Sequence, residues 1–243
     1  MTQDIKFLIT SGCSFSQVPN RDVTWPVHLT QHLNCEAVHL GQGSSGNGII
    51  SRTIIHAVSK ALKSYKPEEL LVGIMWSGYD RHEFFFAEEP IDFKKPDGSS
   101  NPKWIVSPEN EYYYQLSPHW DDQLSSTYYR MFYDQKGSQL QTLEHVLRVQ
   151  LFLKSLNIKY FMTKYAYNTI DMSIITGNED LTYVYDLIDP EHFLAVDNLD
   201  TWAVNSGIPY TIPDDRHPST NHHKEFVNTF IVPHLKAKNY INK

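Results

Sequence analysis

The chain has few cysteines, no basic excess and no long apolar run, and each shortage excludes a class of protein. Its only cysteines, Cys13 and Cys35, are too few for a disulfide framework or a cysteine-based zinc site. Lysine and arginine (21) are outnumbered by aspartate and glutamate (28), so the net charge of −7 argues against a nucleic-acid partner. No stretch approaches the roughly 20 apolar residues that span a bilayer, so we expect no membrane partner.

The start of the chain also lacks the pattern of a secretory signal. The first ten residues contain Asp4 and Lys6, and their apolar run is only Phe7–Ile9. We therefore expect no signal peptide and a cytoplasmic protein with reduced thiols, or a virion protein if the chain is phage-encoded. The composition, 41% hydrophobic and 20% charged, suits a single folded domain over 1–243.

What the chain does have is a regular alternation of strand and helix patterns. The expected strands are Ile5–Thr10, Ala37–Leu40, Leu70–Trp76, Ile158–Thr163 and Ile208–Ile212. The expected helices are Thr24–Leu33, Gly46–Tyr65, Ser138–Asn157 and Asn221–Lys236, the last kinked near Pro233, with shorter helices within 168–206. This alternation predicts an α/β fold around a central parallel sheet of about five strands.

Residues 81–137 interrupt the alternation. The segment is rich in tyrosine, phenylalanine and tryptophan, and it contains the loop signal PDGSSNP at 96–102. We interpret it as an insertion after the third strand, carried on the carboxyl edge of the sheet within the same domain. Exposed aromatic side chains such as Tyr112–Tyr114 and Trp120 would suit stacking on sugar rings.

Small and polar residues follow the predicted strands, at the edge where α/β sheets carry their active sites. Ser14 lies just past the first strand, in the turn SGCSFS. The block LGQGSSGNG at 40–48 follows the second strand, and PDDRHPS at 213–219 follows the last. We therefore expect Ser14 as a nucleophile, His217 as its base and Asp214 as the carboxylate that orients the base.

A tetrahedral intermediate needs hydrogen-bond donors, and the glycine block supplies candidates. The expected donors are the N–H groups of Ser14 and Gly43 and the side-chain amide of Asn47. Gly46 is the alternative to Gly43 as the oxyanion glycine. Asn47 could instead cap the helix that follows it. Arg81 is a candidate substrate contact, with a salt bridge to the insertion as its alternative.

Other interpretations of these residues stay open. Asp215 competes with Asp214 for the orienting role, and Cys13 is an alternative nucleophile. A metal site could be formed by Asp214, Asp215, His217, His222 and His223, but the two adjacent histidines would point in different directions on a helix. We predict no metal and no cofactor.

The blocks resemble those of the SGNH (GDSL-like) hydrolases: GCSFS near the start, the glycine block after the second strand, and DDRHP before the last helix. The resemblance spans residues 12–218. It implies a flavodoxin-like three-layer sandwich and ester hydrolysis through an acyl-enzyme without a cofactor. Ser14, His217 and Asp214 take the catalytic roles in this resemblance, and Gly43 takes that of the oxyanion glycine. Versions with such an insertion resemble those of tailed phages.

The chain departs from the family pattern at two points. Cys13 replaces the aspartate usual before the nucleophile, and WSGYDR at 76–81 lacks the usual asparagine. Loss of one oxyanion donor costs about 10²–10³ in rate, so we expect low or narrow activity. The leading hypothesis is a serine esterase acting on acyl esters, chiefly acetyl, of small molecules or carbohydrates.

Two hypotheses belong to other classes. The fold could serve binding or structure without turnover, as a homo-oligomer or a virion component. The block GQGSSGNG could also bind a nucleotide phosphate, although the chain lacks a Walker lysine. The spacing of Gly41, Gly43 and Gly46 fits the dinucleotide fingerprint, but these glycines follow a short second strand, which is the wrong βαβ unit for such a site.

Overall fold

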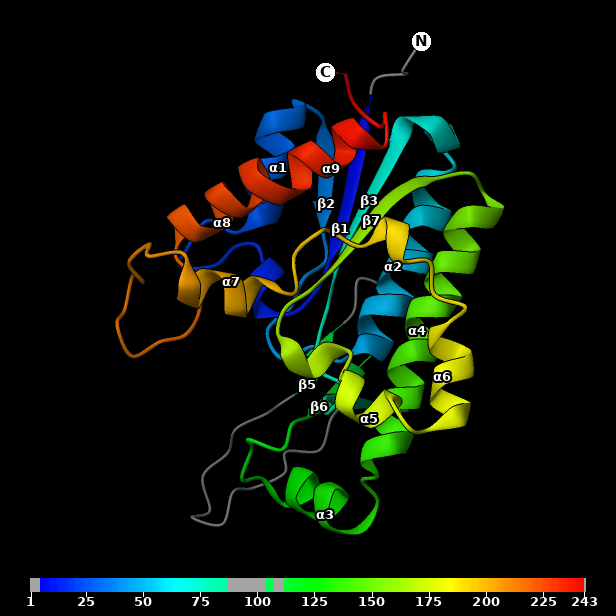
Figure 1. The fold of residues 1–243 in the computed structure, drawn as a ribbon, viewed down its shortest axis with the longest axis vertical. Coiled ribbons are helices and arrows are strands. Elements are labelled where there is room, and N and C mark those ends of the chain that lie inside the picture. Colours follow the sequence, from blue (N-terminus) through cyan, green and yellow to red (C-terminus); the bar gives the residue numbers. More distant parts are fainter. Residues whose placement is uncertain (1–4, 87–103, 107–111, 243) are drawn as a thin grey trace.

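The main sheet is parallel, and helices cover both of its faces (Figure 1). The computed structural model describes residues 5–86, 104–106 and 112–242. Within these ranges the sheet has four strands in the order β2-β1-β3-β7, namely β1 (Phe7–Ser11), β2 (Glu36–His39), β3 (Leu70–Trp76) and β7 (Lys159–Lys164). The strand order reverses between β1 and β3. In sheets of this kind, ligands bind beyond the carboxyl ends of the strands at this point.

Two groups of helices enclose the sheet (Figure 1). One side carries α1 (Trp25–Leu33), α7 (Leu199–Asn205), α8 (Thr220–Phe226) and α9 (Val232–Ala237), and the other carries α2 (Asn47–Ala61), α4 (Gln135–Ser155), α5 (Met172–Ile175) and α6 (Glu179–Tyr185). The core forms two clusters, one on each face of the sheet. Ile9 and Leu8, adjacent on β1, belong to different clusters because successive side chains of a strand point to opposite faces.

The positions of the four strands and of the long helices are those predicted from the sequence. Thr24 is the N-cap of α1 and Pro26 lies in its first turn, where a missing N–H removes no hydrogen bond. The closing helix is irregular at the predicted place. A π-helical turn, Val227–Ile231, joins α8 to α9 just before Pro233, whose nitrogen has no hydrogen to donate to the preceding turn.

The predicted fifth strand is wrong: residues 208–212, all of them described, form no strand. Pro209 and Pro213 have no N–H to donate to a strand ladder. The N–H of Ile208 is taken up locally, since it donates to Oγ of Ser206 over 3.1 Å. Consequently β7 is the last strand of the sheet, and the segment that carries the predicted aspartate and histidine has no backbone pairing with it.

The segment after β3 forms a small antiparallel sheet in the order β4-β6-β5, which lies beyond the carboxyl ends of the main strands (Figure 1). Its strands are β4 (His82–Phe86), β5 (Trp104–Val106) and β6 (Tyr112–Leu116), and α3 (Gln123–Met131) follows. The loop signal at 96–102 lies outside the described residues. The predicted end of the insertion, at 137, falls inside α4. A single domain with an insertion at 81–137 stays a prediction.

Candidate active site

The chain turns sharply after β1, and glycines make room for this turn. A 3₁₀ turn, Ser14–Ser16, follows β1 after two linking residues. A Cβ atom on Gly12 would lie 2.4 Å from Oγ of Ser16 and 2.9 Å from the carbonyl oxygen of Met75. A Cβ atom on Gly41 would lie 2.4 Å from the carbonyl oxygen of Ser16. The turn can therefore pack against both neighbouring strand ends, and it carries Ser14 at the carboxyl edge of the sheet.

Two small buried residues, Cys13 and Ser16, hold the Ser14–Ser16 turn against the core. Ser16 is fully buried, and its Oγ accepts a hydrogen bond from Nε1 of Trp25 over 2.9 Å. Cys13 is also fully buried, among the apolar side chains of the α1 face. Burial removes the Cys13 thiol from solvent, which argues against this residue as the nucleophile.

The structure brings Ser14 into contact with His217, and His217 into contact with an aspartate. Nε2 of His217 lies 3.0 Å from Oγ of Ser14, and Nδ1 lies 2.6 Å from Oδ1 of Asp215. An ionised carboxylate only accepts hydrogen bonds, so Nδ1 carries the proton and Nε2 is free to accept from the Ser14 hydroxyl. The ring of Phe15 packs edge-on against the imidazole, with centroids 5.4 Å apart. A hydroxyl, an imidazole and a carboxylate in this order can generate a nucleophile.

The carboxylate at His217 belongs to Asp215, which corrects the sequence-based choice of Asp214. Asp214 is exposed, whereas Oδ1 of Asp215 accepts hydrogen bonds from both the backbone N–H and the ring of His217. The bond to the backbone two residues ahead forms a local turn that aspartate side chains favour. This turn directs the Asp215 carboxylate toward the imidazole. The spacing between aspartate and histidine in the sequence does not reveal the turn.

The surroundings of Asp215 keep it ionised. The backbone N–H of His217, the His217 ring and the guanidinium of Arg21 hold the pKa of Asp215 well below its ordinary value. His223 and Asp215 line one cavity, and His223 is only 1% exposed, so burial lowers its pKa to about 3. Near neutral pH the site therefore has a charged carboxylate, that of Asp215, and a neutral buried imidazole, that of His223.

Asn47 does not face Ser14, and its expected role as an oxyanion donor is not supported by its contacts. Its side-chain amide donates to the carbonyl oxygen of Ser77 over 3.0 Å and to Oγ1 of Thr142 over 3.1 Å. Its side-chain oxygen accepts from the N–H of Ser77 over 2.7 Å. Asn47 is 2% exposed. These bonds tie the start of α2 to the end of β3 and to α4.

We expect Asn47→Ala to lower the free energy of unfolding by about 2–4 kcal/mol. The substitution leaves the N–H and C=O of the fully buried Ser77 without their partner, and each unpaired buried group costs about 1–3 kcal/mol. Urea unfolding followed by circular dichroism measures the change. A variant of unchanged stability that loses ester hydrolysis would return Asn47 to the oxyanion site.

The two candidate glycines have different surroundings. Gly43 lies beside the nucleophile turn, by which we mean Ser14–Ser16 with Gln17 at its end, because a Cβ on Gly43 would come 3.1 Å from Oε1 of Gln17. Its carbonyl oxygen accepts from Nε2 of Gln115 over 3.0 Å. Gly46 is the N-cap of α2, and a Cβ on it would lie 2.6 Å from the carbonyl oxygen of Arg81. Gly43 thus stays a candidate oxyanion glycine, and Gly46 serves helix packing.

The glycine block does receive an anion, but the anion belongs to the chain itself. Cβ atoms on Gly46 and Gly48 would lie 2.8 Å and 1.9 Å from the carboxylate oxygens of Glu83, which therefore sits against the first turn of α2. Nη2 of Arg52 lies 2.7 Å from Oε1 of Glu83. Burial raises the pKa of Glu83 to about 6, although Arg52 and the N–H of Ile49 oppose the rise. A nucleotide phosphate would have to displace this carboxylate.

Arg81 packs behind an aromatic side chain, where its guanidinium also interacts with Cys13, the neighbour of Ser14. Its Nη1 donates to Oγ of Ser77 over 3.0 Å, and its guanidinium lies 4.7 Å from the centroid of the Tyr165 ring. Tyr165 in turn contacts Phe15 edge-on, with centroids 5.5 Å apart. Arg81 thus supports the residues around Ser14 from behind, and its predicted role as a substrate contact stays without a supporting contact.

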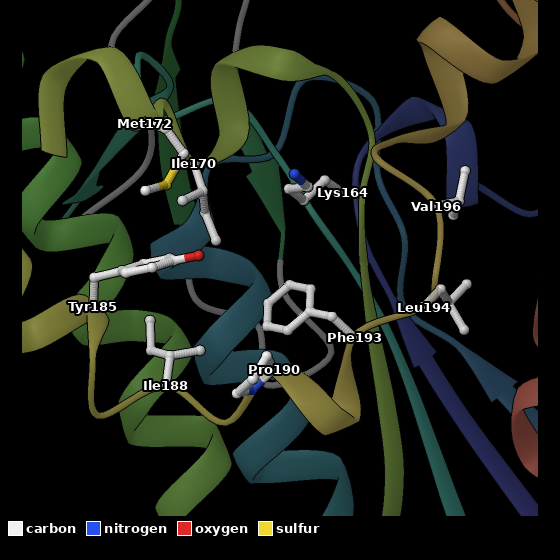
Figure 2. A pocket seen from close by; sticks show the side chains of 9 residues that line it. All are labelled: Lys164, Ile170, Met172, Tyr185, Ile188, Pro190, Phe193, Leu194 and Val196. Carbon is white, nitrogen blue, oxygen red and sulfur yellow. The ribbon is translucent and has the colours of Figure 1, made fainter. Parts of the chain in front are cut away.

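A small cavity opens directly at Ser14. Its volume is about 210 Å³, and its lining includes Ser14, Gln17, Asn20, Arg21, Asp215 and His217. A second cavity, of about 170 Å³, is lined mainly by apolar side chains, and Ile170, Tyr185, Ile188 and Phe193 converge on it (Figure 2). Lys164 at its edge pairs with Asp197 over 2.9 Å. The residues that line the apolar cavity do not include Ser14 or His217, so this cavity does not adjoin the candidate nucleophile.

The histidines considered as metal ligands are used otherwise. Nδ1 of His222 accepts from the N–H of Ser219 over 3.0 Å and thereby caps α8. In the described ranges, no group of three or more His, Cys, Asp or Glu side chains is placed to hold a metal ion.

Fold and site together define an α/β protein whose serine, histidine and aspartate meet at the carboxyl edge of a parallel sheet. The chain belongs to a family of unknown function (DUF6071), which matches residues 17–243 and so includes Asp215 and His217. No curated protein matches its sequence. Among solved structures it is similar to one described as a candidate lipolytic protein of the G-D-S-L family from Desulfitobacterium hafniense. The identity is 12% and the TM-score 0.47, over 92% of this chain and 96% of the other.

No helix among the described residues is long and apolar enough to cross a membrane.

Proposed function

We propose that the protein is a serine esterase of the SGNH type. The observation that carries the proposal is the contact series from Oγ of Ser14 through His217 to Asp215. The order of the parallel strands adds support, since β2-β1-β3-β7 corresponds to the first four positions of a flavodoxin-like sheet. The reversal of strand order between β1 and β3 supports a ligand site beside Ser14, since sheets of this kind bind their ligands at that point.

The proposed reaction proceeds through an acyl-enzyme. Oγ of Ser14 attacks the acyl carbon while Nε2 of His217 takes the hydroxyl proton, and Asp215 stabilises the resulting imidazolium. The N–H groups of Ser14 and Gly43 are the proposed donors to the oxyanion. The C–O bond to the leaving alcohol then breaks, and His217 returns the proton to the alcohol oxygen. Water, deprotonated by His217, then attacks the acyl carbon, the bond from that carbon to Oγ of Ser14 breaks, and His217 returns the proton to Oγ as the acid leaves. The reaction needs no cofactor.

We further propose acetyl or other short acyl esters as substrates, on small molecules or carbohydrates. The cavity at Ser14 measures about 210 Å³, somewhat above the roughly 150 Å³ of a cavity that holds benzene. A short acyl group suits such a volume. Polar side chains such as Gln17, Asn20 and Arg21 in its lining suit a hydroxylated alcohol part.

Labelling with a fluorophosphonate tests the proposal. We expect one adduct on the wild type, detected by intact mass, and none on Ser14→Ala or His217→Ala, because only an activated serine reacts at a useful rate. Urea-unfolded wild type is the control for nonspecific labelling. A folded wild type that takes up no label would refute the esterase and leave a binding or structural protein, with the virion role among its alternatives.

A further inference from the structure

One short segment of the described chain contacts both the nucleophile turn and the segment that carries the base. Asn20, Arg21 and Asp22 lie between the 3₁₀ turn and α1. The side-chain amide of Asn20 donates to the carbonyl oxygen of Ser14 over 3.1 Å, and its side-chain oxygen accepts from the N–H of Arg21 over 2.7 Å. The function proposed above gives Asn20 and Arg21 only a contact with the alcohol part of the substrate, and it gives Asp22 no role.

Arg21 contacts the carboxylate that holds the base. Its Nη1 lies 2.9 Å from Oδ2 of Asp215, and its Nε lies 3.0 Å from Oδ2 of Asp22. The other oxygen of Asp215, Oδ1, is the one that binds His217. Each oxygen of the Asp215 carboxylate therefore has its own partner, which restricts rotation of the carboxylate about its last bond.

Asp22 anchors Arg21 to the segment on either side of the base. Its Oδ1 accepts from Oγ1 of Thr211 over 2.7 Å and from the N–H and Oγ1 of Thr220 over 3.2 Å. Asp22 is 8% exposed. Burial alone would raise the pKa of Asp22, but the bonds from Thr211 and Arg21 outweigh it and hold the pKa below its ordinary value. Asp22 is thus a charged, buried support for the guanidinium.

We propose that Arg21 is a positioning residue for the Asp215–His217 pair, anchored by Asp22; this inference rests on the proposed esterase function. Residues 208–212 form no strand, so the segment ahead of Asp215 is held by side chains and not by a backbone ladder. The His217 side chain is itself 47% exposed, so the edge-on contact with Phe15 covers only part of the ring. Arg21 supplies the missing restraint by fixing the carboxylate that orients the ring.

The test compares Arg21→Gln and Arg21→Lys with a matched control, Arg216→Gln. Arg216 lies in the same segment and pairs with another aspartate, with Nη2 3.1 Å from Oδ2 of Asp200. The control therefore removes an arginine–aspartate pair whose side chains bond to neither Asp215 nor His217. The readouts are the fluorophosphonate labelling rate of Ser14, kcat and KM for 4-nitrophenyl acetate, and the thermal unfolding midpoint.

We expect Arg21→Gln to lower kcat and the labelling rate by about 10²-fold with little change in KM, because misplacing a catalytic group by about 1 Å has that effect. Arg21→Lys keeps the charge and should recover part of the rate, though one ammonium cannot bind both carboxylates as the planar fork does. Arg216→Gln should stay within about twofold of the wild type.

The outcomes separate the two proposals. Wild-type rates in Arg21→Gln, with Ser14 labelled as expected, would overturn the positioning role alone. Equal losses in Arg21→Gln and Arg216→Gln, or a loss that follows the unfolding midpoint, would overturn it as well by showing a general structural effect. No labelling of the wild type would overturn the esterase, and the positioning role with it.

Discussion

Replacing Asp215 by asparagine is expected to lower kcat for ester hydrolysis by about 10³–10⁴-fold, whereas Asp214→Asn should leave the rate within about twofold. The carboxylate accepts the Nδ1–H of His217, and this bond selects the tautomer in which Nε2 can take the Ser14 proton. An asparagine can present its NH₂ group to Nδ1 instead, which favours the tautomer with its proton on Nε2. The imidazole then cannot act as a base toward Ser14.

The two aspartates are an internally matched pair. They are adjacent and have the same charge, so the two substitutions change the net charge equally. Only Asp215 contacts His217. Rates with 4-nitrophenyl acetate on both purified variants decide the assignment. If Asp214→Asn were the slower variant, the turn that directs Asp215 toward the ring would not exist in solution, and the sequence-based choice would stand.

Gly41→Ala is expected to destabilise the fold by about 1–3 kcal/mol or more and to abolish most labelling of Ser14. A Cβ at this position would lie 2.4 Å from the carbonyl oxygen of Ser16 and 2.6 Å from its carbonyl carbon. These are backbone atoms of the nucleophile turn, so they can give way only if the turn moves. The same displacement would carry Ser14 away from His217.

Gly43→Ala is the control, because it adds the same methyl group two residues further along the loop. Its Cβ would meet only Oε1 of Gln17, at 3.1 Å, and that atom ends a flexible side chain. The backbone N–H proposed as an oxyanion donor is kept in alanine. Urea unfolding and labelling rates on both variants make the comparison. Equal behaviour of the two would mean that the turn and the glycine loop are not in close contact.

Much of the fold could be predicted because the sequence patterns reflect burial. Leu70–Trp76 is apolar throughout and forms β3, which is buried on both faces as such a pattern indicates. The fifth strand was wrong because Ile208, Tyr210 and Ile212 alternate like a strand. Periodicity records side chains only, and neither Pro209 nor Pro213, which follows the stretch, has the N–H group that a ladder needs.

The candidate site was predictable in outline but not in detail. Ser14 was expected at the carboxyl edge of the sheet because it follows β1, where such sheets gather their ligand-binding residues. His217 was expected there behind a strand at 208–212 that does not form, and side-chain contacts bring it to Ser14 instead. The choice between Asp214 and Asp215 depends on a turn of two residues, which spacing does not encode. The roles of Asn47 and Glu83 depend on partners some 30 residues away in sequence, and pattern analysis does not pair such positions.

The absence of a strand at 208–212 separates the durability of the fold from that of the site. The main sheet is held by continuous parallel ladders, whereas the segment with Asp215 and His217 is held by a few side-chain bonds from the loop before α1. Segments held in this way open at a lower free-energy cost than core strands. Better packing of the core would thus raise the melting temperature without protecting activity, whereas a cross-link between that loop and residues 211–220 would protect activity directly. The contacts between residues 20–22 and residues 211–220 are therefore the ones to strengthen in an engineered variant.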